Sequence, residues 1–253
     1  LTNHKVSVGP PFYNSVIIPI VILFLFFMSL GPQIQWIKNK FYNLNLIIKI
    51  LVASILINFA IIFLFKSYSL LSNFIIISAL FLIIYSLRDL YNLFKTKKID
   101  ASRIVSHLAF GYLVLFIGIN YNFSLEKDFN LKLGEQRIFK DYSLEFKDLQ
   151  LQDFKNYKAV IGEFKIKNKT NNLEDTLYPE IRIYMKPSTI TYEASIKTSL
   201  LKDYYITMSN IDRSDYYNIK FQKKPFMIWI WISVIFISIG GFLSLFKKEK
   251  KNY

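Results

Sequence analysis

The residue types best suited to chemistry are scarce in this chain. Its 253 residues contain two histidines, His4 and His107, and no cysteine. Without cysteine the chain cannot form a disulfide framework, a cysteine-ligated zinc or iron–sulfur site, a thiol nucleophile, or a haem linkage through its own Cys-x-x-Cys-His motif. Two histidines are also too few for a multi-histidine metal centre.

His107 is the more informative histidine, because it lies inside an apolar segment, directly after Ser106 and four residues after Arg103. An ionisable side chain within a membrane is costly unless it is paired, and it is by default a functional candidate. The imidazole could coordinate a metal, with Ser106 and Arg103 as supporting groups, or hydrogen-bond to a neighbouring helix without any cofactor. The residues taken alone favour the second interpretation.

Five segments are long and apolar enough to cross a bilayer, which takes roughly 20 residues. The first is not a secretory signal peptide, since it lacks a basic n-region and a small-residue cleavage site. Two of the five flank a long polar block. The pattern predicts an α-helical integral membrane protein with five transmembrane helices. The segments are Tyr13–Leu30, Leu46–Phe65, Leu70–Leu87, Ile104–Ile119 and Phe226–Phe246.

The distribution of Lys and Arg orients these helices, because short loops on the inner side of a membrane carry an excess of both. The loops and the tail on one side carry eleven, whereas the opposite short segments carry only Lys5 and Lys66. We therefore expect the polar block outside and the C-terminus inside. The block holds 18 basic and 15 acidic residues, so the net charge of +14 comes mainly from topology. That near balance argues against a nucleic-acid partner, which would need a basic stripe.

The polar block shows short alternating runs in place of helical periodicity, and turn signals separate them. It predicts a small antiparallel β sandwich or barrel inserted between the fourth and fifth helices. We expect three regions: a four-helix membrane region at 1–120, the β domain at 121–224, and the last helix with a basic tail at 225–253. The expected strands are Phe129–Leu133, Tyr142–Phe146, Val160–Ile166, Ile181–Tyr184, Tyr204–Met208 and Tyr217–Phe221.

No enzyme constellation occurs in the β domain. It has no histidine to complete a Ser-His-Asp arrangement, no glycine-rich phosphate loop and no aspartate cluster at calcium-loop spacing. The adjacent carboxylates Glu174 and Asp175 lie in a polar stretch, where a solvated loop is the expected role. We therefore predict no catalytic residue in this chain.

Four local patterns stand out: Ser7–Asn14 (SVGPPFYN), Gly31–Trp36 (GPQIQW), Ser106–Gly111 (SHLAFG) and Lys224–Trp231 (KPFMIWIW). In this order and spacing they resemble the C-terminal part of the CcmF-type cytochrome c haem lyase, the membrane subunit of a multi-component cytochrome c maturation system. The resemblance covers essentially the whole chain. Two positions depart from it, because the family usually has proline where Gln35 stands and a basic residue where Ile228 stands.

The resemblance implies a role for His107 as an axial ligand of a membrane-embedded haem b. His4 cannot be the second ligand, because the predicted topology places it on the other side of about 30 Å of hydrocarbon. The implied haem b is therefore shared with a partner chain. That partner is expected to supply the second ligand and the tryptophan-rich external segment of the family, since this chain has only Trp36, Trp229 and Trp231.

The function implied is the C-terminal subunit of a split cytochrome c haem lyase, not catalytic alone. Its partners would be the N-terminal lyase subunit, a haem chaperone, apocytochrome c and membrane lipid. We expect it in the mitochondrial inner membrane, or a bacterial inner membrane. The β domain would then face the intermembrane space or periplasm, and the C-terminus the matrix or cytoplasm. The alternative is a non-catalytic accessory subunit of a respiratory-chain complex derived from this family.

Overall fold

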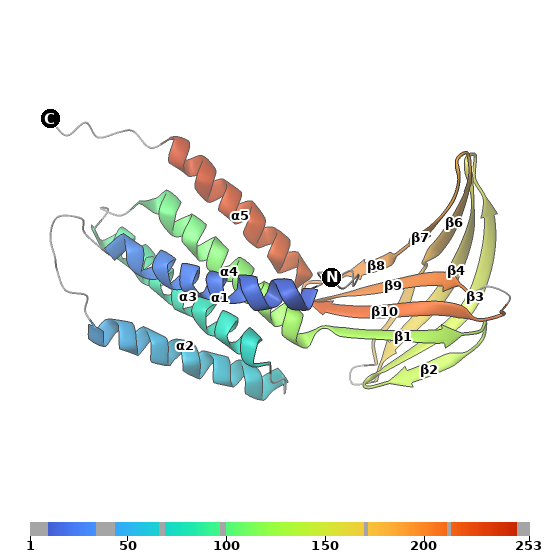
Figure 1. The fold of residues 1–253 in the computed structure, drawn as a ribbon, viewed down its shortest axis with the longest axis horizontal. Helices are drawn as coiled ribbons and strands as arrows, with labels where there is room; N and C mark the ends of the chain where they lie inside the picture. Colours follow the sequence, from blue (N-terminus) through green and yellow to red (C-terminus); the bar gives the residue numbers. More distant parts are fainter. Residues whose placement is uncertain are drawn as a thin grey trace, which may run out of the picture. The chain divides into compact units, whose positions relative to one another are not determined.

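The computed structural model describes residues 10–33, 44–65, 69–96, 100–169, 172–211 and 214–246. The chain forms two units, and Figure 1 shows the helices and strands of each. The helical unit takes in Leu1–Phe123 and Ile228–Tyr253, and the β unit takes in Ser124–Met227. The predictions for His4, for residues 34–43 and for the basic tail from residue 247 fall outside the described residues.

The helical unit is built from apolar helices, as predicted. Four of the described helices are long and apolar enough to cross a membrane, and Val16–Leu30 of α1 is a shorter apolar stretch. The prediction of an α-helical membrane protein with an inserted β domain is confirmed. The helices are α1 (Pro10–Leu30), α2 (Leu44–Phe65), α3 (Leu70–Thr96), α4 (Ala101–Phe123) and α5 (Met227–Leu245), and η1 (Gly31–Gln33) follows α1.

Helices α3 and α4 extend beyond the apolar segments that predicted them. Helix α3 continues to Thr96, nine residues past Leu87, because a helix can run on into the polar headgroup region. Helix α4 begins at Ala101 because Asp100 caps it: the Ser102 N–H donates to Asp100 Oδ1 at 3.1 Å. The cap fixes the start of the helix that carries His107.

The β unit is a sandwich of antiparallel strands. One sheet has the order β1-β10-β9-β8, and the other has the order β2-β3-β4-β6-β7 with β5 paired to β4. The strands are β1 (Leu125–Leu131), β2 (Gln136–Phe139), β3 (Tyr142–Asp153), β4 (Tyr157–Asn168), β5 (Glu174–Leu177), β6 (Glu180–Met185), β7 (Ser188–Glu193), β8 (Ser195–Thr198), β9 (Lys202–Asn210) and β10 (Tyr217–Pro225).

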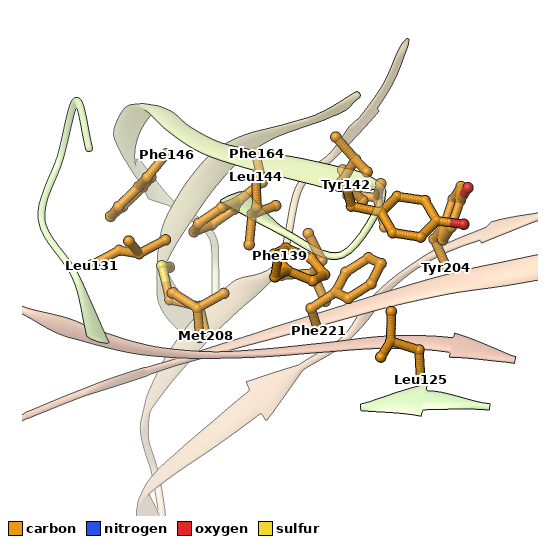
Figure 2. Close-up of a cluster of buried hydrophobic side chains, with 14 of the residues drawn as sticks. Leu125, Leu131, Phe139, Tyr142, Leu144, Phe146, Phe164, Tyr204, Met208 and Phe221 are labelled. Atoms are coloured by element: carbon orange, nitrogen blue, oxygen red, sulfur yellow. The ribbon is translucent and has the colours of Figure 1, made fainter. Parts of the chain in front are cut away.

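Aromatic side chains from both sheets fill the core of the sandwich, as Figure 2 shows. Phe146 and Phe164 stack with ring centroids 4.4 Å apart, and Phe139 meets Phe221 edge to face at 5.2 Å. Gly162 leaves room for this packing, because a Cβ there would lie 2.7 Å from the Phe164 ring. Alternating apolar residues, as in β4, therefore make the inner layer of each sheet.

Candidate functional site

Helix α4 holds His107 half-buried, on the face that packs against α3. Residues three, four and seven apart share a helix face, so His107 lies in line with Arg103, Gly111 and Gly118. Both glycines lie close to α3: an added Cβ would come within 2.7 Å of Ile83 at Gly111 and within 3.1 Å of Ile76 at Gly118. The close approach of the two helices sets the surroundings of the imidazole.

An ion pair between α3 and α4 lies one helical turn from His107. The Arg103 Nη2 atom is 3.4 Å from Asp89 Oδ2, and the two side chains are 33% and 20% exposed. Asp89 is a residue that the sequence analysis missed. The available signal was that Asp89 is the one acidic residue within the apolar sequence of α3.

Ser106 belongs to a different contact. The Cβ of an alanine at position 240 would lie 2.3 Å from Ser106 Oγ, and Ser102 Oγ donates to the Gly240 carbonyl at 2.7 Å. Both serines therefore meet helix α5, whereas His107 lies about 100° further round the helix from Ser106. We assign Ser106 to helix packing, so that Arg103 is the remaining candidate for a group supporting His107.

A cavity of about 480 Å³ opens between α4 and α5 on the face opposite His107. Its wall is almost entirely apolar, and Phe116 stacks on Trp229 at 5.8 Å. His107 does not line it, so this cavity is separate from the candidate ligand. The lining residues are Val105, Leu108, Ala109, Tyr112, Phe116, Trp229, Ile232, Ser233, Phe236 and Ile239.

The side chains that could bind a metal are too few for a chelating site made by this chain alone, within the described residues. Among the residues that the structure describes, no three His, Asp or Glu side chains gather into a chelating group. A single half-buried imidazole on a membrane helix would suit haem iron, because the porphyrin itself supplies most of the donor atoms. The residues present on α4 therefore fit a haem ligand role for His107.

Two tyrosines of the β unit pack against each other and have a raised pKa. Tyr142 and Tyr204 meet edge to face at 5.9 Å, and both lie at one end of the core in Figure 2. Burial raises the pKa of both phenols above the ordinary value. They therefore remain neutral at physiological pH, and they serve as core residues with a polar edge.

Comparison with known proteins starts from the β unit, where residues 122–225 match the family described as the CcmF C-terminal beta-sandwich. The cytochrome c-type biogenesis protein CcmF of Haemophilus influenzae is 25% identical over 260 residues, covering 97% of this chain and 40% of its own length. The chain resembles the C-terminal part of CcmF. The resemblance predicted from the four sequence patterns is confirmed.

A solved structure and a plant protein are also similar to this chain. A solved structure titled Cytochrome c Heme Lyase CcmF superposes with a TM-score of 0.75 at 18% identity, covering 94% of this chain and 41% of that chain. An Arabidopsis thaliana protein named as a CcmF C-terminal-like mitochondrial protein is 34% identical over 85 residues, covering 33% of this chain and 19% of its own length. The chain thus spans about two fifths of the length of the bacterial relatives it matches.

Proposed function

We propose that this chain is the C-terminal subunit of a split cytochrome c haem lyase, and that His107 is an axial ligand of a membrane haem b. The single observation that carries the proposal is the placement of His107. It lies half-buried on α4, beside the Arg103–Asp89 pair, in a fold that matches CcmF. The relative in Arabidopsis, named as C-terminal-like and mitochondrial, supports the split form.

The residues of this chain would act by holding and positioning the haem. His107 supplies one nitrogen, and Arg103 carries guanidinium N–H groups beyond the one bonded to Asp89, which suit a carboxylate such as a haem propionate. When bound, the haem supplies one-electron redox chemistry. Since no second histidine lies near His107 in the described residues, the other axial ligand would come from an N-terminal lyase subunit.

The remaining partners follow from the same proposal. A haem chaperone would deliver the substrate haem, and apocytochrome c would present its thiols to the assembled enzyme. The β unit would face the intermembrane space or periplasm, and the C-terminus the matrix or cytoplasm. The Lys and Arg distribution supports this orientation.

The test is an optical spectrum of the copurified complex. His107→Ala is expected to abolish most of the reduced b-type signal, because one axial ligand is lost. Ser106→Ala is the matched control, since Ser106 contacts α5 and should leave the spectrum unchanged. An unchanged b-type signal in the His107→Ala complex would rule out the ligand role.

The subunits that copurify separate this proposal from the accessory-subunit alternative. Cytochrome c maturation proteins together with bound haem support the lyase assignment. Stoichiometric association with an oxidase or a respiratory supercomplex, without haem at His107, contradicts it.

A further inference from the structure

The links from α4 to the β unit and from the β unit to α5 both join the same end of the four-stranded sheet. Strand β1 begins at Leu125, two residues after α4 ends, and strand β10 ends at Pro225, two residues before α5 begins. The strands are antiparallel, and Leu125 pairs with Lys223. This end of the sheet is therefore the end that is covalently continuous with both helices.

The β8–β9 hairpin tip lies at the same end. The Phe226 N–H donates to the Leu201 carbonyl at 3.0 Å, and Phe226 directly precedes the first residue of α5. Leu201 is thus hydrogen-bonded to the residue directly before the last apolar helix. Trp229, in the first turn of that helix, is of a residue type that gathers at the membrane–water boundary.

This tip carries two exposed leucines. Leu200 and Leu201 are 64% and 65% exposed, next to each other, on a hairpin whose neighbours are polar. Adjacent exposed leucines leave apolar surface in contact with water, which is unfavourable. The same leucines are favourable when they enter the acyl boundary of a bilayer.

Three lysines of β9 and β10 lie near the tip, and the ammonium group of each lies over a tyrosine ring. Lys202 Nζ lies 4.8 Å from the Tyr204 ring centre, Lys223 Nζ lies 5.7 Å from Tyr142, and Lys224 Nζ lies 5.1 Å from Tyr205. Two acidic residues lie near these lysines. Asp203 pairs in register with Lys224 but is only 4% exposed, and Glu126, one row further from the tip, forms an ion pair with Lys220. The exposed charge of the last rows at the tip, from Lys202, Lys223 and Lys224, is therefore positive.

We propose that the β8–β9 hairpin tip is a membrane-surface anchor of the β unit. Leu200 and Leu201 insert at the acyl boundary, and Lys202, Lys223 and Lys224 bind the phosphate groups of anionic phospholipids. The anchor would hold the β unit to the bilayer at a third point, beyond its two covalent links to α4 and α5. This inference does not depend on haem at His107.

The absence of cysteine allows a direct test in the full chain. Leu200→Cys, labelled with an environment-sensitive NBD fluorophore, is placed in phosphatidylcholine nanodiscs containing doxyl-labelled phosphatidylcholine. The label at position 200 is expected to show blue-shifted emission and at least fivefold stronger quenching than the same label at Leu151→Cys. Leu151 is the matched control, since it is 80% exposed on β3. Equal quenching of the labels at positions 200 and 151 would mean that the hairpin tip lies in water or against a protein partner, and it would overturn the proposal.

The lipid charge is tested by exchanging doxyl-labelled phosphatidylcholine for doxyl-labelled phosphatidylglycerol. Each lysine near the surface favours an anionic lipid by about fivefold, so the label at position 200 should be quenched more by the anionic lipid. Combining Lys202→Gln, Lys223→Gln and Lys224→Gln should remove that preference while keeping the quenching by phosphatidylcholine. Combining Lys155→Gln, Lys158→Gln and Lys186→Gln, at or beside the β3–β4 and β6–β7 turns, should leave it intact. No preference in the parent chain, or equal loss in both triple variants, contradicts the role of these lysines.

Discussion

Helix α4 divides its polar side chains between two neighbours. Arg103 and His107 lie toward α3, where Arg103 pairs with Asp89, whereas Ser102 and Ser106 contact Gly240 of α5. The two pairs point to different neighbours because adjacent residues of an α-helix differ by about 100° around the helix axis. Arg103 therefore lies one helical turn from the proposed haem ligand, whereas the two serines join α4 to α5.

The Arg103–Asp89 pair gives a prediction about stability. Asp89→Asn should lower the free energy of unfolding by about 1–2 kcal/mol, since it leaves a partly buried guanidinium without its counter-charge. The double variant Asp89→Asn/Arg103→Gln should recover most of the loss, because no unpaired charge remains. Thermal unfolding in detergent measures both. Equal losses in the single and double variants would show that the two charges are not coupled.

At the level of elements, glycine decides how close α5 comes to α4. Small residues let helix backbones approach each other in a membrane, where lipid gives no hydrophobic drive to helix association. Gly240 lies in the contact with Ser102 and Ser106, but the neighbouring Gly241 has nothing within 4 Å of an added Cβ. The two glycines therefore have different roles although they are adjacent.

Substitution of each glycine by leucine tests this difference. Gly240→Leu should separate α5 from α4 and lower stability by about 1–3 kcal/mol, the usual cost of overpacking. Gly241→Leu should have little effect, because its side chain would enter open space. Thermal unfolding of the two variants in the same detergent is the measurement. A Gly241→Leu loss as large as that of Gly240→Leu would place the helix contact elsewhere.

The strands missed from the sequence share a place in the fold. Strands β2, β7 and β8 lie at the edges of the two sheets, and β5 pairs only with β4. Their residues are mostly exposed, as the pattern of β7 shows, so they lack the clean alternation that one buried face imposes. The six expected strands overlap β1, β3, β4, β6, β9 and β10, because these strands supply the core. The bounds differ most for β1, which spans Leu125–Leu131 where Phe129–Leu133 was expected.

On the scale of the whole molecule, one chain forms two units whose surfaces suit different surroundings, lipid for the helical unit and water for the β unit. The helical unit exposes apolar side chains such as Phe63, at 82%, as suits a lipid environment. The β unit buries its aromatics between two sheets and exposes paired charges such as Lys167 and Glu174. The proposed topology places that unit outside the membrane and the α3 C-terminus inside.

Labelling from one side of the membrane checks this topology. In the cysteine-free chain, Lys155→Cys in the β unit should react with an impermeant maleimide applied from the outer side. Lys95→Cys, in the last turn of α3, should react only after the membrane is opened. Both positions are exposed, so access and not burial decides the labelling. The opposite pattern would invert the assignment.

The sequence by itself determined the membrane class, the inserted β domain, the strands that build its core and the likeness to CcmF. It could do so because apolar length, period-two alternation and ordered local motifs are all read along the chain. Only the tertiary structure paired Arg103 with Asp89, assigned Ser106 to α5, and brought Leu201 to Phe226. Those contacts join residues at least 14 positions apart, and they depend on how closely backbones approach, which no local pattern encodes.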